Sequence, residues 1–177
     1  MTARIGILLS GSGTTYDNLV HAITDGHIDA EIVVVVGSRI GLGGLQLAAD
    51  HGHPSCIAQL SDEVTAALTD ATVDYVVMCG WLKYWDPPAR WSQRTVNIHP
   101  SLLPSFGGKG FYGSRVHQAV LAAGCTVSGC TAHLVSGGYD TGPILAQRCV
   151  PVLPADDATS LQARVQAAER ELYPLVV

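Results

Sequence analysis

The chain has 177 residues, of which 47% are hydrophobic and 14% charged, and its formal net charge is −5. This apolar content excludes an intrinsically disordered chain, and the length is enough for one domain with its own core. The acidic balance and the lack of a lysine- or arginine-rich block argue against nucleic acid or an anionic membrane as a partner, although one phosphate group could still be bound locally.

The N-terminus and the cysteines bear on the cellular compartment. Residues 1–6 lack the pattern of a signal peptide, and no apolar stretch approaches the roughly 18 residues of a membrane-spanning helix. The five cysteines are odd in number and form no Cys-x-x-Cys pair. We therefore expect reduced thiols and a cytoplasmic protein.

The first half of the chain alternates short apolar runs with amphipathic segments. Runs that are apolar on both faces indicate strands of a parallel sheet, with helices covering both sides. We expect strands at residues 5–9, 31–36, 55–58 and 75–78, and helices at residues 16–24, 45–51 and 62–68.

The second half has longer β-like runs, which follow a strand carrying His99 and a glycine-rich loop. We expect a helix, two antiparallel strands and a closing amphipathic helix at residues 115–123, 128–135, 144–152 and 158–172. Asp156 or Asp157 is the expected N-cap of the last helix. The expected fold class is α/β: a Rossmann-like, mostly parallel sheet flanked by helices, with antiparallel strands in the C-terminal half.

Asn97 and His99 lie two residues apart at the end of an expected strand, just before a proline-stiffened turn. Alternate residues of a strand face the same side, so the two side chains share a face. Pro100 disfavours a helix at His99 and ends the strand, and Pro104 closes the turn. Because open α/β sheets bind ligands at the carboxyl ends of their strands, this amide and imidazole predict a site that stabilises an oxyanion and moves a proton.

A glycine-rich loop, Ser10–Thr15, follows the first expected strand and opens a helix, where backbone N–H groups and the helix dipole favour an anion. Tyr16 stands where a dinucleotide-binding loop needs glycine or alanine, and no acidic residue ends the second strand, which disfavours a nicotinamide cofactor. We expect instead a single phosphomonoester held by Gly13, Thr14 and Thr15. A tight turn without a ligand is the alternative.

Asp140 lies in a polar, glycine-rich loop between the last two expected strands. A carboxylate near His99 would favour the charged form of the imidazole. Together with the amide of Asn97, these groups could polarise a carbonyl and relay a proton in acyl transfer. Aspartate is also a common turn former, so a purely structural role for Asp140 is the alternative.

His117 and His133 could in principle join His99 and Asp140 around a metal ion. No two of these histidines have the His-x-x-x-His spacing that places both on one helix face. His133 alternates with Thr131 along a strand, as a hydrogen-bonded histidine of the core would. We therefore expect no metal.

The sequence resembles the folate-dependent formyltransferases over nearly its whole length, from Ile5 to Pro174. The residues that carry the resemblance are Leu9–Gly13, Asn97–Pro104 and Tyr139–Ile144. The resemblance implies one formyltransferase domain over residues 1–177, with a phosphate-binding half at residues 1–95 and a catalytic and folate-binding half at residues 96–177.

The resemblance also implies the reaction and the roles of a catalytic triad. The formyl group of 10-formyltetrahydrofolate, a co-substrate, would pass to the amine of glycinamide ribonucleotide in purine biosynthesis, without a metal. Asn97 and His99 would stabilise the tetrahedral oxyanion. Asp140 would hold the His99 imidazolium and help to move the amine proton to the departing folate nitrogen.

Further residues match substrate-binding positions of the family, although Thr14 and Thr15 replace the Ser-Asn pair that often ends its phosphate loop. For the acceptor these residues are Gly13, Thr14, Thr15, Gln166 and Glu169, and Lys109 could also reach its phosphate. For the pterin ring of the folate they are Trp81, Leu82, Tyr84, Trp85, Val96, Val135 and Tyr139. The aromatic residues among them could equally belong to the core beside a turn.

Four alternative functions share parts of this pattern: transfer to methionyl-tRNA, transfer to another amine such as an amino sugar, hydrolysis of formyltetrahydrofolate, and non-catalytic binding of a phosphate ligand. The acidity of the chain argues against tRNA, and the hydrolases typically carry a regulatory domain that would not fit within 177 residues. A mere binder is expected to have lost part of the triad, which is present here. The expected partners are thus small molecules, and a homodimer is left open.

Overall fold

The computed structural model describes residues 2–177 and divides into two compact units. The first unit extends to Asn97 and includes Val177, and the second unit spans Ile98–Val176. The expectation of a single domain over residues 1–177 stays a prediction, and residue 1 lies outside the described residues.

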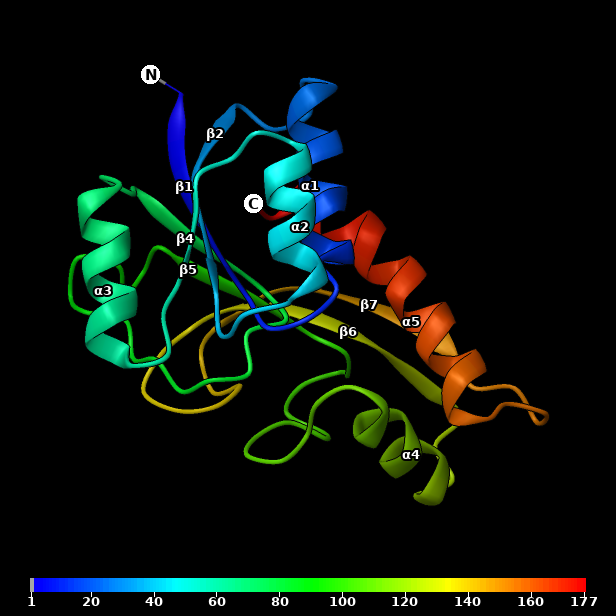
Figure 1. Cartoon of the computed structure of the whole chain (residues 1–177). Helices are drawn as coiled ribbons and strands as arrows, with labels where there is room; N and C mark the ends of the chain where they lie inside the picture. Colours follow the sequence, from blue (N-terminus) through cyan, green and yellow to red (C-terminus); the bar gives the residue numbers. More distant parts are fainter. Residues whose placement is uncertain (1) are drawn as a thin grey trace. The chain divides into compact units, whose positions relative to one another are not determined.

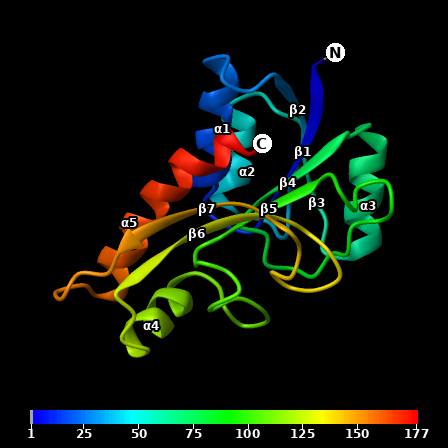
Figure 2. The same ribbon diagram turned by 180° about the vertical axis from the view of Figure 1, so that it is seen from behind.

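Parallel strands alternate with helices along the first unit. In chain order they are β1 (Ala3–Leu9), α1 (Thr14–Thr24), β2 (Ala30–Gly37), α2 (Gly43–Asp50), β3 (Ser55–Ile57), α3 (Ser61–Asp70), β4 (Tyr75–Cys79) and β5 (Thr95–His99), of which the residues up to Asn97 belong to this unit. The strand order is β3-β2-β1-β4-β5, and Figure 2 labels all five strands. The chain steps outward from β1 to β3 and then returns past β1 to β4. Because parallel crossovers are right-handed, α1 and α2 lie on one face of the sheet and α3 lies on the other, as Figures 1 and 2 show from opposite sides.

Burial explains why the strands of this unit form. Ile7, Leu8 and Leu9 of β1 and Val35 and Val36 of β2 are fully buried, although successive residues of a strand face opposite sides. Both faces of the sheet are therefore covered, in agreement with the continuous apolar runs of the sequence. Each expected strand and helix of this half is present, with small differences at the ends.

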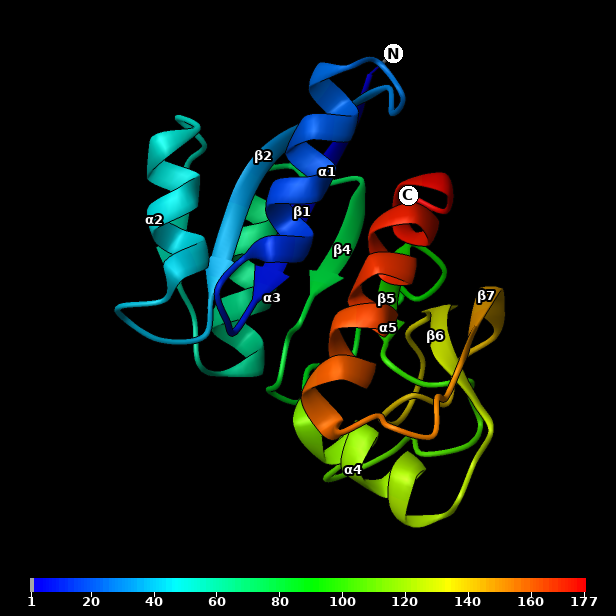
Figure 3. The same cartoon turned by 90° about the vertical axis from the view of Figure 1, so that its right-hand side faces the viewer.

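The second unit combines a pair of strands with helices. After the end of β5 come α4 (Ser114–Ala122), β6 (Val127–Leu134), β7 (Ile144–Pro151), α5 (Ala158–Leu172) and the short 3-10 helix η1 (Tyr173–Leu175). Strands β6 and β7 are antiparallel. Helix α5 packs against both strands, as Figure 3 shows, and also against α4. The expected fold class, a mostly parallel sheet flanked by helices with antiparallel strands in the C-terminal half, is thus confirmed.

Helix α5 begins where the sequence predicts. Asp157 is its N-cap, and the Asp157 side chain accepts a hydrogen bond of 2.8 Å from the N–H of Ser160. The chain continues from α5 into η1, which was not expected. Pro174 in η1 lacks the N–H that a continued α-helix would use. The buried residues of α5 recur every three or four positions and form one apolar stripe: Leu161, Val165, Ala168 and Leu172.

Within residues 2–177, no helix is long and apolar enough to cross a membrane.

Candidate active site

Asn97 lies at the carboxyl edge of the parallel sheet of the first unit. It pairs with Met78 of β4, while the next residue of β4, Cys79, pairs with Leu9 at the end of β1. The loop Ser10–Thr15 leaves the sheet directly after Leu9, so the half-buried Asn97 and this loop share one edge of the sheet. Open α/β sheets bind their ligands at this edge.

His99, two residues further along β5, is buried and has an acceptor at each ring nitrogen. Nε2 lies 2.9 Å from the carbonyl oxygen of Phe106, and Nδ1 lies 3.4 Å from Oδ2 of Asp140. The backbone carbonyl on one side and the carboxylate on the other fix the orientation of the ring.

Asp140 is held in place by the backbone around it. Its φ of 58° is left-handed, a conformation that aspartate and asparagine adopt more readily than other residues with a side chain. The N–H of Gly108 donates to Oδ2 of Asp140 at 2.9 Å, and a Cβ on Gly107 would lie 3.3 Å from the Cβ of Asp140. The structure thus brings together His99 and Asp140, two members of the expected triad, and Asn97 shares the strand of His99.

A buried hydroxyl group fixes the turn that follows His99. Oγ1 of Thr131 donates to the carbonyl oxygen of Ser101 at 2.6 Å and accepts from the N–H of Leu103 at 3.0 Å. The only sign of this role in the sequence is a hydroxyl residue inside an expected strand, close to His133. The backbone carbonyl and N–H groups that contact His99 and Asp140 leave no sign there at all, because every residue has them.

Two further histidines of the second unit, His117 and His133, are also buried, and burial lowers the pKa of both. Nε2 of His133 lies 3.7 Å from Oδ1 of Asp140, and Nδ1 lies 2.9 Å from the carbonyl oxygen of Leu134. These contacts suit a hydrogen-bonded core histidine. Among the described residues, no group of three or more His, Cys, Asp or Glu side chains is placed to hold a metal ion.

The loop expected to bind phosphate has the geometry of an open helix N-terminus. Gly13 is the N-cap of α1, with a left-handed φ of 88°, and no side chain caps this helix. The N–H groups of the first turn therefore lack a side-chain acceptor, which favours an anion there. Gly13 itself is buried, whereas Thr14 is exposed and Thr15 is half-buried.

Gly13→Ala is expected to destabilise the protein by at least about 2 kcal/mol, because the new Cβ needs a strained left-handed backbone and lies in occupied space. That Cβ would be 2.5 Å from the Cα of Gly44. Gly11→Ala is the matched control, since a Cβ on Gly11 meets nothing within 4 Å. Urea unfolding of both variants tests this, and equal midpoints would contradict it.

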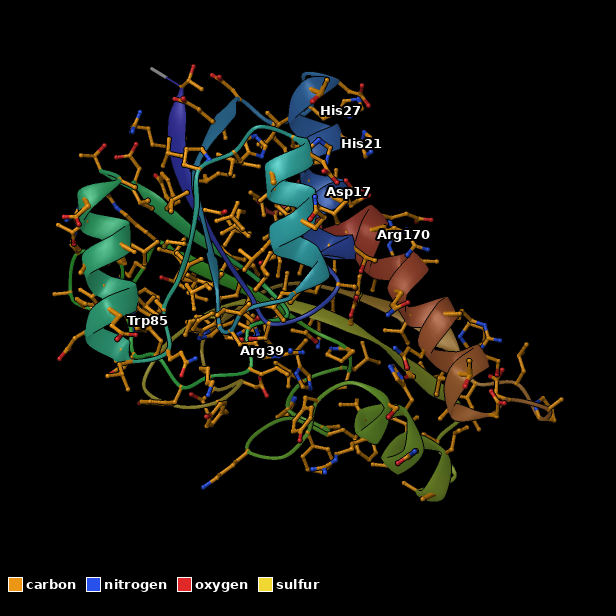
Figure 4. The ribbon with its side chains drawn as sticks, viewed as in Figure 1. Asp17, His21, His27, Arg39, Trp85 and Arg170 are labelled. Carbon is orange, nitrogen blue, oxygen red and sulfur yellow. The ribbon has the colours of Figure 1, made fainter. Side chains whose placement is uncertain are left out.

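The residues expected around the pterin ring differ in their surroundings. Trp85 is 3% exposed and lies beside α3 (Figure 4). Its Nε1–H donates to Oγ1 of Thr65 at 3.1 Å, as suits a core residue. Trp81 is also buried, but its Nε1–H has no hydrogen-bond partner within the described residues, which suits a contact with a ligand. The other expected pocket residues are exposed or half-buried: Leu82, Tyr84, Val96, Val135 and Tyr139.

The residues expected to contact the acceptor lie partly on α5. Gln166 and Glu169 are half-buried and three residues apart, so they lie on the same side of the helix. Lys109 is exposed in the glycine-rich loop 107–113 of the same unit. Burial raises the pKa of Glu169 to about 7. Such a shift is common at functional sites.

Glu169→Gln is expected to change how stability depends on pH. Folding favours the neutral form of Glu169, whose usual pKa is 4.5, so its contribution is intact below that pH and is lost as the pH rises through about 7. Relative to the glutamine variant, wild type should lose about 3 kcal/mol between pH 4 and pH 8. Urea unfolding at both pH values measures this. The same pH dependence in both proteins would show that the carboxyl group is not desolvated.

The fold and the polar groups at the carboxyl ends of its strands place the chain in a broad class, the Rossmann-like α/β proteins that bind ligands at this edge of the sheet. Within that class, the sequence model of the formyl transferase family matches residues 3–177. The chain belongs to the formyl transferase family. The resemblance inferred from its motifs is therefore confirmed.

Curated relatives carry names from purine biosynthesis. The chain is 40% identical to the chloroplastic phosphoribosylglycinamide formyltransferase of Vigna unguiculata, over 98% of this chain and 59% of the relative. It is 38% identical to the trifunctional purine biosynthetic protein adenosine-3 of Drosophila melanogaster, over 97% of this chain and 13% of the relative. The chain thus spans less than two thirds of the length of these relatives.

Solved structures match over nearly the whole chain. The phosphoribosylglycinamide formyltransferase of Brucella melitensis is 37% identical, with a TM-score of 0.89 over 99% of this chain and 94% of that one. The glycinamide ribonucleotide transformylase 1 of Geobacillus kaustophilus is 32% identical, with a TM-score of 0.90 over 99% and 97%.

Proposed function

We propose that this chain transfers the formyl group of 10-formyltetrahydrofolate to the amine of glycinamide ribonucleotide. The observation that carries the proposal is the contact between the half-buried Asp140 and His99, which is buried and lies two residues beyond Asn97 on β5. An amide, an imidazole and a carboxylate can together polarise a carbonyl, stabilise an oxyanion and relay a proton in acyl transfer to an amine. The names of the relatives support this choice of acceptor.

The proposed reaction begins when the acceptor amine attacks the formyl carbon and the carbonyl oxygen becomes an oxyanion. The amide of Asn97 and the Nε2–H of His99 would donate to that oxygen. For this, His99 would exchange the carbonyl of Phe106 for the oxyanion, which is the stronger acceptor. Asp140 would keep the imidazolium oriented and charged, as the carboxylate does in other triads.

The tetrahedral intermediate would then collapse. The bond between the formyl carbon and N10 of the folate breaks, and N10 leaves with a proton that originates from the amine. Asp140 is the group proposed to pass this proton, through water. The formylated amine and tetrahydrofolate are the products, so atoms and charges balance without a metal.

The other site residues complete the proposal. Gly13, Thr14 and Thr15 would hold the phosphate of the ribonucleotide, and Lys109 would supply a further cation. Gln166 and Glu169 would contact its glycinamide and ribose. The folate would lie against Trp81, Leu82, Tyr84, Val96, Val135 and Tyr139, with Trp85 supporting them from the core. The same proposal includes a cytoplasmic location and small molecules as the only partners. It allows either a monomer or a homodimer.

A spectroscopic assay of tetrahydrofolate release tests the function. We expect turnover of the formyl donor that depends on glycinamide ribonucleotide. Rapid turnover without an acceptor would identify a hydrolase instead, and turnover only with an amino sugar would identify a sugar formyltransferase. No turnover under any of these conditions, with the ribonucleotide still bound, would leave a non-catalytic binder.

A further inference from the structure

Arg39 lies in the loop between β2 and α2. We propose that Arg39 binds the phosphate of the acceptor and makes the site selective for a dianionic phosphomonoester over an acceptor without phosphate. This inference rests on the proposed function, because it assumes that the loop at Gly13 holds that phosphate.

The loop that carries Arg39 lies against the phosphate loop of the same unit. The N–H of Ser38 donates to the carbonyl oxygen of Leu9 at 3.1 Å, directly before the phosphate loop begins. Further along, the N–H of Gly44 donates to the carbonyl oxygen of Gly11 at 3.2 Å. The segment between Ser38 and Gly44 is therefore anchored to the phosphate loop at both ends, and Arg39 is next to one anchor.

Glycines allow this close approach. A Cβ on Gly13 would lie 2.5 Å from the Cα of Gly44, and a Cβ on Gly43 would lie 3.1 Å from the carbonyl oxygen of Ser12. Helices α1 and α2 thus begin side by side, and neither has a side-chain cap. The partial positive charges of both N-termini therefore lie close together, next to the segment that carries Arg39.

Arg39 makes no ion pair and no aromatic contact within the described residues of the first unit. It is exposed, and Figure 4 shows it at the carboxyl end of β2. Among the described residues of the first unit, Arg39 and Lys83 are the only cations without an ion pair or an aromatic contact. The other cations have partners: Arg4 pairs with Glu31, Arg90 lies over Trp91, and Arg94 lies over Tyr75.

An additional cation near the phosphate loop would offset the negative charge of Asp17. Asp17 lies in the first turn of α1, where its carboxylate would oppose a bound phosphate. His51 and His21 contact Asp17 at 2.8 and 3.7 Å and offset its charge only when they are protonated. The planar guanidinium of an arginine carries a positive charge and can donate two parallel hydrogen bonds to one phosphate.

The test compares Arg39→Gln with Lys83→Gln. Lys83 is the matched control because it is the other cation of the first unit without an ion pair or an aromatic contact within the described residues. We expect R39Q to raise the KM for glycinamide ribonucleotide about tenfold, with the KM for the formyl donor and kcat unchanged. Inhibition by inorganic phosphate should weaken by a similar factor. K83Q should leave the KM for the ribonucleotide unchanged, and R39K should recover part of the loss.

A dephosphorylated acceptor, glycinamide riboside, separates charge recognition from other causes. R39Q and wild type should use the riboside equally well. An unchanged KM for the ribonucleotide in R39Q would overturn the inference. So would an equal loss with the riboside, or an equal loss in R39K and R39Q, since the loop rather than the charge would then be responsible.

The inference and the proposed function can fail separately. If wild type has no acceptor-dependent turnover, the proposed function has failed. Calorimetric titration with inorganic phosphate then still compares wild type with R39Q. Equal phosphate affinity in the two proteins would overturn the role of Arg39.

Discussion

Asp140→Asn is expected to lower kcat by about three orders of magnitude while the protein stays folded. Asparagine is the informative replacement, because it tolerates the left-handed φ of 58° at this position better than alanine does. Its amide oxygen can still accept the hydrogen bond from Gly108. The variant thus removes the negative charge beside His99 and little else, so the loss measures what that charge contributes. Turnover with both substrates saturating is the measurement.

Two controls make the Asp140 result decisive. Asp70→Asn also removes one carboxylate, at the exposed end of α3, and should leave kcat unchanged. Asp140→Ala should cost as much activity as the asparagine variant and also lower the melting temperature, because alanine strains the left-handed backbone. If D140N kept more than a tenth of the wild-type kcat, Asp140 would be only a turn residue.

Asn97→Ala is expected to lower kcat by about two to three orders of magnitude, the usual cost of losing one donor to an oxyanion. Asn97 is half-buried at the carboxyl edge of the sheet, and truncating it removes the amide without cutting into the apolar core. Asn97→Asp should be at least as damaging, because a carboxylate would repel the oxyanion. Single-turnover kinetics report the chemical step directly.

The control for Asn97 is Gln93→Ala, an exposed amide shortly before β5. It should behave as wild type in the same assay. The KM for the ribonucleotide should change little in N97A, since the amide is proposed to act on the transition state. A raised KM with normal kcat would instead assign Asn97 to substrate binding.

Local patterns were sufficient to predict strands β1–β7 and helices α1–α5, but not the short helix η1. Apolar runs predicted the strands, amphipathic runs predicted the helices, and an aspartate at position 156 or 157 was the expected N-cap of α5, which is Asp157 in the structure. The shared edge of the Ser10–Thr15 loop and Asn97 also follows locally, because each comes at the carboxyl end of a parallel strand. Each of these features depends on residues within a few positions of one another.

Other features could not be predicted, because they depend on residues far apart in the chain. The sequence left Asp140 as either a turn residue or a partner of His99, and the structure places its carboxylate 3.4 Å from Nδ1 of that histidine. The sequence also left open whether Trp85 lines the pterin pocket or belongs to the core. The hydrogen bond from its indole N–H to Thr65 suits a core residue. The raised pKa of Glu169 comes from burial, which no local pattern reports.

The sequence by itself determined the class of fold, the family, and the pairing of Asn97 and His99 on one strand, because strand periodicity and short motifs are local properties. Only the tertiary structure decided which groups surround His99: the carboxylate of Asp140, the carbonyl of Phe106 and the hydroxyl-fixed turn behind them. It also set the loop of Arg39 against the phosphate loop, through two backbone hydrogen bonds that any residues could make. Such contacts depend on how distant segments pack and on backbone groups that are the same in every residue, so they cannot be read from residue types alone.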